Sequence, residues 1–167
     1  MKKMDLSKFA LADLLLVAVK SEIDSQEIYA RVALRVQNAF LRERLNFLSQ
    51  EEKKHQQVLE NIFRQRFPGR EIVVPVQPVV PLPEIRFRDE TVPLSEILAQ
   101  AMKAEQAAHD FYLLLAERFN DDFEKKNLLL YFSMMEMGHY KLLELEKSNL
   151  ERLEEFGQEQ ELIHIGP

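Results

Sequence analysis

Apolar residues recur at steps of three and four along four stretches of the chain, at about 11–36, 45–62, 97–119 and 129–150. This spacing puts them on one face of an α-helix, because an α-helix completes a turn every 3.6 residues. In all four stretches the apolar face also contains acidic residues, and in two of them a histidine. These polar positions are Glu22, Glu52, His55, Glu105, Glu136 and His139. The pattern predicts an all-α protein of four amphipathic helices with a polar cluster at the height of the core.

Breaks in this pattern predict the turns and the linker. Polar residues around Asn38 and around Asn120 separate the helices of each pair, and Pro68 with Gly69 ends the second helix. Residues 68–93 carry six of the seven prolines, so this segment is predicted to be extended. We therefore expect residues 1–167 to form a single domain. It comprises hairpin one (11–67), a crossover (68–93), hairpin two (94–156) and a tail (157–167) that begins where Gly157 ends the fourth helix.

The two hairpins repeat one another in sequence. "AVKSE" at 18–22 matches "AMKAE" at 101–105, and the pair Glu52/His55 matches Glu136/His139. In an antiparallel hairpin, residues equally far from the turn lie at the same height. The midpoint between the first glutamate and the Glu-x-x-His pair falls on a polar turn in both halves. The repeat thus predicts that each lone glutamate faces a Glu-x-x-His pair across the core.

The length of the crossover bears on the topology. Fully extended, it can reach about 85 Å, whereas a helix of 28 residues is only about 42 Å long. The crossover can therefore return along the whole bundle, as in ferritin-like bundles. A slack loop that returns to the same end is the alternative.

A cluster of buried acids needs a counter-charge. An ionised carboxylate in a core costs several kcal/mol, against a total stability of about 5–15 kcal/mol. Two divalent metal ions would neutralise the cluster, each with one histidine, one glutamate of its own and two shared glutamates. A carboxylate-rich, sulfur-free ligand set favours iron or manganese over structural zinc. The alternative is a buried polar network without metal.

Composition excludes several classes of function. The chain has no cysteine, so disulfides, thiol catalysis and Cys-ligated iron are excluded. A net charge of −6 without a basic run argues against nucleic-acid or anionic-membrane partners. The apolar run at 14–19 is too short to span a bilayer, and no signal peptide is evident. A cytoplasmic location is expected.

The sequences "AVKSE…Y" and "AMKAE…Y", together with the two Glu-x-x-His pairs, resemble the ferritin-like di-iron carboxylate proteins, in particular the rubrerythrin branch, over about residues 11–156. The resemblance implies a ferritin-like four-helix bundle holding two iron ions, with manganese or a mixed pair as alternatives. It also implies ligand roles. Glu22 and Glu105 would be terminal ligands, Glu52 and Glu136 would bridge, and His55 and His139 would each cap one metal.

Two departures from the rubrerythrin pattern matter. Typical rubrerythrins carry a Cys-rich rubredoxin module as electron donor, so this cysteine-free chain would need a separate donor protein or a small reductant. Ala108 stands where rubrerythrins carry an additional glutamate, which makes peroxidase chemistry a weaker expectation than the metal site.

Further residues are candidates for roles around the ligands. Tyr29 and Tyr112 lie seven residues after the lone glutamates and could hydrogen-bond ligand carboxylates or take part in one-electron steps; the alternative is that they are core tyrosines. His109 follows Glu105 by four residues, and is either a further ligand or a histidine at the rim of the site. Each ligand histidine needs an acceptor for its other N–H, and the candidates are Asp24 and Asp110.

The resulting functional hypothesis is a non-haem di-iron oxidoreductase that activates peroxide or O2, by peroxide reduction, ferroxidase activity or oxygen scavenging. Such a protein would serve in oxidative stress, and we expect a homo-oligomer, a dimer or larger. The alternatives are an iron-binding or storage protein, a di-iron hydroxylase of an organic substrate, and a metal-free interaction module built around "EIVVPVQPVVPLP" at residues 71–83.

Overall fold

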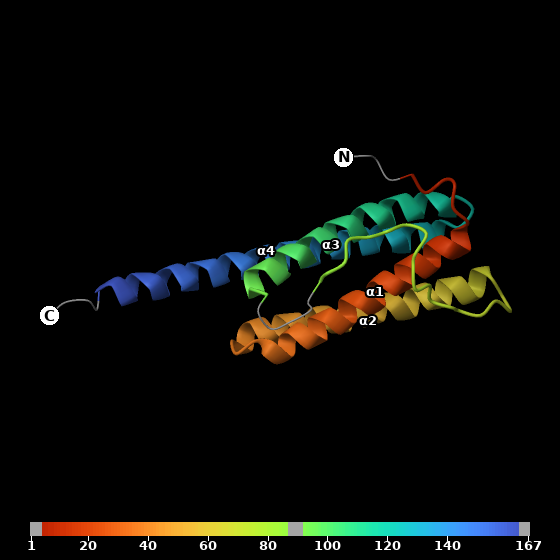
Figure 1. Ribbon diagram of the computed structural model, residues 1–167. Helices are drawn as coiled ribbons and strands as arrows, with labels where there is room; N and C mark the ends of the chain where they lie inside the picture. Colours follow the sequence, from red (N-terminus) through yellow and green to blue (C-terminus); the bar gives the residue numbers. More distant parts are fainter. Residues whose placement is uncertain (1–4, 87–91, 164–167) are drawn as a thin grey trace.

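The computed structural model describes residues 5–86 and 92–163, and for residues 154–163 it describes only the helical backbone. Two antiparallel hairpins make up this part of the chain (Figure 1). Hairpin one consists of α1 (Leu11–Arg35) and α2 (Ala39–Arg66). Hairpin two consists of α3 (Leu94–Ala116), the short 3-10 turn η1 (Glu117–Phe119) and α4 (Phe123–Ile163). The prediction of an all-α four-helix bundle is confirmed.

Polar residues of the two turns start the second helix of each hairpin. The Asn38 side chain accepts a hydrogen bond from the Leu41 N–H at 3.2 Å. The Asp122 side chain accepts one from the Lys125 N–H at 3.1 Å. The first N–H groups of a helix have no partner within it, so these caps satisfy donors that would otherwise be left unpaired. The chain therefore reverses where its polar turn residues predict.

The predicted end of the fourth helix is wrong. α4 continues through Gly157 and ends at Ile163, so it is 41 residues long. A glycine inside a helix costs only about 1 kcal/mol relative to alanine. The residues on both sides of Gly157 are mostly glutamate, glutamine and leucine, which favour the helix and outweigh that cost. Of the predicted tail, residues 164–167 lie outside the described residues, His164 among them.

The crossover returns along the length of the bundle. It leaves hairpin one at the end where α2 finishes and runs back over α1 to the opposite end, where α3 begins (Figure 1). Two of its own residues, Val80 and Ile85, are buried against the bundle, whereas its Val76 is 92% exposed. The Arg86 N–H donates to the Gln100 side chain at 2.8 Å. Of the two alternatives for this linker, the structure has the long crossover.

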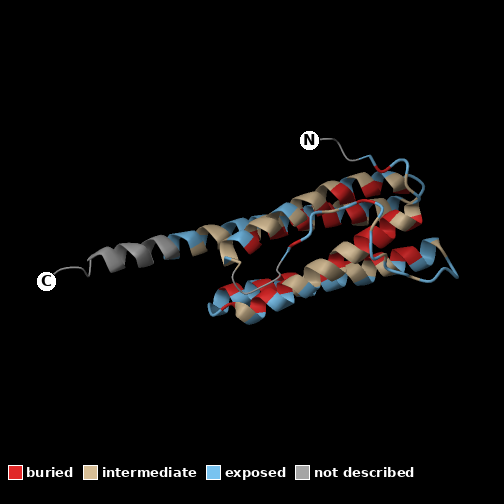
Figure 2. Ribbon diagram, in the orientation of Figure 1, coloured by how far each residue is buried: buried red, intermediate tan, exposed pale blue. Residues whose placement is uncertain are grey.

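The inward faces of the helices form two apolar clusters, one toward each end of the bundle (Figure 2). One contains Leu15, Leu59, Phe63, Phe119 and Leu129. The other contains Val32, Leu45, Leu48, Ile97 and Leu143. The six polar residues of the apolar faces are also buried. None of the helices in the described ranges has both the length and the apolar character needed to cross a membrane.

Candidate metal centre

The six polar residues of the apolar faces converge in the core. Hairpin one supplies Glu22, Glu52 and His55, and hairpin two supplies the equivalent residues. None of the six is more than 4% exposed. They form two groups whose potential ligand atoms lie within 4.8 Å of one another. The first is Glu22, Glu52, His55 and Glu136, and the second is Glu52, Glu105, Glu136 and His139.

Both groups contain Glu52 and Glu136, so these two carboxylates are shared. Each group adds one glutamate and one histidine of its own. The imidazoles face the shared carboxylates through Nδ1. His55 Nδ1 lies 2.9 Å from Glu136 Oε1, and His139 Nδ1 lies 3.0 Å from Glu52 Oε1. The closest carboxylate of each histidine therefore belongs to the opposite hairpin.

Several of these atoms are buried without a hydrogen bond. Both histidine Nδ1 atoms, both oxygens of Glu52 and Oε1 of Glu136 are buried and make no hydrogen bond. An orphaned polar group in a core costs about 1–3 kcal/mol, and more when it is charged. Two cations, one in each group, would satisfy all five atoms. Carboxylate oxygen and imidazole nitrogen form a donor set that suits iron or manganese.

Electrostatics divides the four carboxyl groups into two pairs. Burial, reinforced by repulsion from Glu136 and Glu52, raises the pKa of Glu22 well above its ordinary value. Burial, with repulsion from the same two residues, also raises the pKa of Glu105. For Glu52, burial acts in the same direction, but the two nearby histidines outweigh it and lower the pKa. Glu136 behaves like Glu52, and its pKa is also lowered.

The histidines respond in the opposite sense. Burial alone would lower the pKa of His55, but the carboxylates of Glu136, Glu22 and Glu52 outweigh it and raise the pKa to about 12. The pKa of His139 is raised in the same way. Without metal, protons on the histidines and on the unshared glutamates neutralise the cluster. Metal ions would have to displace these protons, so binding releases protons and strengthens as the pH rises.

Two buried tyrosines link the hairpins at this centre. The Tyr29 hydroxyl donates to Oε1 of Glu105, and the Tyr112 hydroxyl donates to Oε1 of Glu22. Each tyrosine therefore holds the unshared glutamate of the other hairpin. Seven residues span about 10.5 Å of helix, too far for a tyrosine to reach the glutamate of its own helix. That spacing is the signal from which the crossed pairing could have been predicted.

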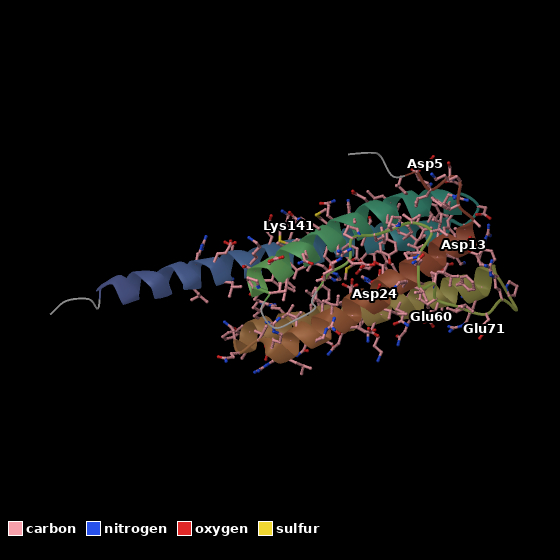
Figure 3. The ribbon with its side chains drawn as sticks, viewed as in Figure 1. Asp5, Asp13, Asp24, Glu60, Glu71 and Lys141 are labelled. Carbon is pink, nitrogen blue, oxygen red and sulfur yellow. The ribbon has the colours of Figure 1, made fainter. Side chains whose placement is uncertain are left out.

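The structure places the remaining candidates elsewhere. His109 is half-buried and belongs to neither group. Its Nδ1 lies 2.6 Å from the backbone oxygen of Ser133; a carbonyl only accepts, so Nδ1 is the donor. Asp24, labelled in Figure 3, pairs with Lys20 at 2.7 Å, and Asp110 accepts from Gln106 at 3.3 Å.

Neither aspartate is hydrogen-bonded to a ligand histidine in the described part of the chain, and His139 Nε2 is buried without a partner. The aspartates were candidates because of their sequence positions alone. Lys20 and Gln106, each four residues away on the same helix, are the partners they have instead.

The side chain of Phe132 packs against the cluster, and the sequence alone did not identify it as part of the site. Its ring centroid lies 4.4 Å from that of His55, and it meets the ring of Tyr112 edge-on at 5.7 Å. Phe132 lies four residues before Glu136, on the inward face of the fourth helix. This spacing is the one sequence signal that could have placed it beside the cluster. Phe132 shields this side of the cluster with apolar surface.

A four-helix bundle with a long crossover, four core glutamates and two Glu-x-x-His pairs defines the ferritin-like carboxylate class. Within that class the chain belongs to the Rubrerythrin family, whose family model matches residues 13–147. It is similar to the solved structure of a hypothetical protein from Pyrococcus furiosus, with 36% sequence identity and a TM-score of 0.80. That similarity covers 89% of this chain and 95% of the other. Among curated proteins, no match is found.

Proposed function

We propose that the chain is a di-iron oxidoreductase that reduces peroxide or O2 with electrons from a separate donor. The observation that carries this proposal is the sharing of Glu52 and Glu136 between two four-residue groups. Shared carboxylates are what a pair of metal ions needs in order to act on the two oxygen atoms of one small molecule. A buried polar network without metal would leave five polar atoms unsatisfied.

Held by the six ligand residues, two ferrous ions would supply the two electrons that the reduction of one H2O2, with two protons, to two molecules of water requires. The protein's own residues prepare the site for this. Tyr29 and Tyr112 orient the unshared glutamates through their hydroxyl groups. The apolar clusters on both sides, with Phe132, limit the access of bulk water. The chain has no cysteine, so a separate donor protein or small reductant returns the ions to the ferrous state.

Metal stoichiometry tests the site itself. Loaded with ferrous iron without oxygen, the protein is expected to hold two ions per chain, and anomalous scattering at the iron edge should place them at the two groups. Glu52→Gln should reduce the content below one ion, because Glu52 serves both groups. Glu144→Gln, a change at an exposed position eight residues beyond Glu136, is the matched control and should keep two. Less than one ion in the unaltered protein would refute the proposal.

Reaction kinetics test the activity. The ferrous protein, mixed separately with H2O2 and with O2 in a stopped-flow instrument, should be oxidised much faster by one of them. A preference for H2O2 identifies a peroxidase, and a preference for O2 identifies an oxidase or ferroxidase. Equal and slow oxidation by both would argue against a dedicated enzyme.

One observation favours a second candidate, the hydroxylase. A cavity of about 330 Å³ lies between α1 and the crossover. Its lining includes Ser21 and Ala104, the residues that precede Glu22 and Glu105. Apolar side chains of the crossover line it together with charged ones such as Lys20, Asp24 and Glu84. A volume of this size suits a small organic molecule. If this candidate is right, such a molecule should accelerate O2 consumption by the reduced protein and be recovered with one added oxygen atom.

A further inference from the structure

A large open cavity lies between α3 and α4 of hairpin two. Its volume is about 1240 Å³, whereas small-molecule sites commonly measure about 300–1,000 Å³. Its walls are largely apolar, and the apolar residues are Pro83, Ala99, Met102, Ala107, Leu113 and Leu114. The side chain of Tyr140 lines it as well. The cavity therefore offers the room and the surface that an organic ring system needs.

This cavity is level with the metal centre. Gln106 and Tyr140 line it, and in the sequence they directly follow Glu105 and His139. Its lining on α3 extends over residues 99–114, which is about 22 Å of helix with Glu105 near the middle. None of the six ligand residues lines it. A molecule in the cavity is thus separated from the centre by about one helix, which measures about 10–12 Å across.

One wall of the cavity carries a lysine whose counterpart in hairpin one is paired. The internal match aligns Lys103 with Lys20, since each lies two residues before an unshared glutamate. Lys20 Nζ donates to the Asp24 carboxylate at 2.7 Å. The position equivalent to Asp24 in hairpin two is Ala107, and the exposed Lys103 has no ion-pair partner among the described residues. The second half of the chain thus keeps the positive charge but lacks the acid that neutralises it.

The other charged residues of the lining each have a partner close by on the same helix. These pairs are Glu144 with Lys141, Lys147 with Glu151, and Asp110 with Gln106. Within the described ranges, the ammonium group of Lys103 is therefore the one charge on the cavity wall that a bound anion can neutralise without breaking an existing pair. Apolar walls and an unpaired cation together specify a ligand that is apolar over most of its surface and anionic at one end.

We propose that this cavity binds a planar aromatic molecule with an anionic group, and that the reduced form of this molecule is the electron donor of the metal centre. The apolar walls and Tyr140 hold the ring, and Lys103 holds the anionic group. On oxidation the donor loses two electrons and two protons, and the two electrons return two ferric ions to the ferrous state. The sequence has no cysteine to hold an iron centre that would do this. The donor role rests on the proposed function, whereas the binding site does not.

Binding of flavin mononucleotide to the metal-free protein tests the site. This probe has three fused rings and a phosphate, and its fluorescence reports binding. We expect a dissociation constant below about 100 µM that rises with NaCl, because salt screens the contact with Lys103. Lys103→Glu should raise the dissociation constant at least about tenfold. Ala107→Asp should do the same, because it gives Lys103 the partner that Lys20 has in Asp24.

Lys53→Glu is the matched control. Lys53 is also an exposed helical lysine without an ion-pair partner in the described part of the chain, but it lies on α2, outside the cavity. This variant should bind the probe like the unaltered protein, and circular dichroism should show full helix content in all three variants. Absence of saturable binding to the unaltered protein would overturn the proposal, and so would binding that tolerates both Lys103→Glu and Ala107→Asp. A change in sedimentation coefficient caused by Lys103→Glu would assign this face to a second copy and also overturn it.

The donor role has its own measurement. Reduced flavin mononucleotide, mixed without oxygen with the ferric protein, should reduce it at a rate that saturates with flavin concentration and falls at least about tenfold in Lys103→Glu at low flavin concentration. A rate that stays linear and ignores the substitution would overturn the donor role. Saturable binding to a protein that takes up no iron would refute the proposed function and the donor role together, and would support the binding site alone.

Discussion

At the scale of single residues, the centre depends on pairs that reach from one hairpin to the other. Each tyrosine hydroxyl donates to the unshared glutamate of the opposite hairpin. Each imidazole lies nearest the shared carboxylate of the opposite hairpin. Neither hairpin alone contains either group of four residues. The same side chains that would hold a metal therefore also join the two halves of the fold.

Replacing Tyr112 by phenylalanine tests one of these links. The change removes the donor to a carboxyl group that is 3% exposed, and no water can take its place without rearrangement. We expect the free energy of unfolding of the metal-free protein to fall by about 1–3 kcal/mol, measured by urea denaturation. Tyr131→Phe, at a position 55% exposed, should have almost no effect. Equal effects of the two changes would show that the buried hydrogen bond contributes nothing specific.

At the scale of secondary-structure elements, two glycines have opposite backbone requirements. Gly138 lies within α4, is exposed, and has no atom within 4 Å of where a Cβ would be. Gly69 follows the end of α2 with a φ of +82°, a conformation that side-chain-bearing residues seldom adopt. Gly138 therefore weakens α4, whereas Gly69 permits the turn at which α2 ends and the crossover begins.

Alanine substitutions at these glycines should therefore act in opposite directions. Gly138→Ala is expected to raise the free energy of unfolding by about 1 kcal/mol through helix propensity. Gly69→Ala should lower it by about 1 kcal/mol, because alanine is strained at positive φ. Thermal denaturation of the two variants beside the unaltered protein measures both effects. A destabilising Gly138→Ala would mean that another surface packs against that position.

At the scale of the whole molecule, the stability of the metal-free protein should fall as the pH rises, and bound metal should reverse this trend. Glu22 and Glu105 have raised pKa values in the folded chain, so their contribution is complete below the ordinary value of 4.5 and is lost as the pH rises through the raised value. His55 loses its contribution between 6.5 and about 12. The lowered pKa values of Glu52 and Glu136 matter only below 4.5.

The metal-free protein should therefore unfold at progressively lower temperature as the pH rises from about 5 to 9. The metal-loaded protein should show the opposite trend over the lower part of this range, because deprotonation of the ligands strengthens binding. Calorimetry at several pH values, with and without a chelator, measures both. Metal-free stability that increased with pH would contradict the electrostatic account of the cluster.

Much of this architecture could be predicted from the sequence because two periodicities reinforce each other. The helical repeat identified the inward faces, and the match between the halves indicated which polar residues lie at one height. The end of α4 and the partners of individual side chains depend on neighbouring residues, which the spacing of apolar positions does not describe. Gly157 resembles a helix end, but its neighbours favour the helix. Asp24 and Asp110 were eligible acceptors, but nearby side chains on their own helices are their partners.

The internal match between the hairpins has a consequence for how the protein can diversify. Two identical hairpins assembled as separate chains would have to change together at every equivalent position. Joined in one polypeptide, each half can acquire substitutions that the other lacks. Gln26 in the first half already corresponds to His109 in the second, and described crossover residues line a cavity beside α1. Linking the halves therefore allows two inequivalent approaches to a nearly symmetric cluster.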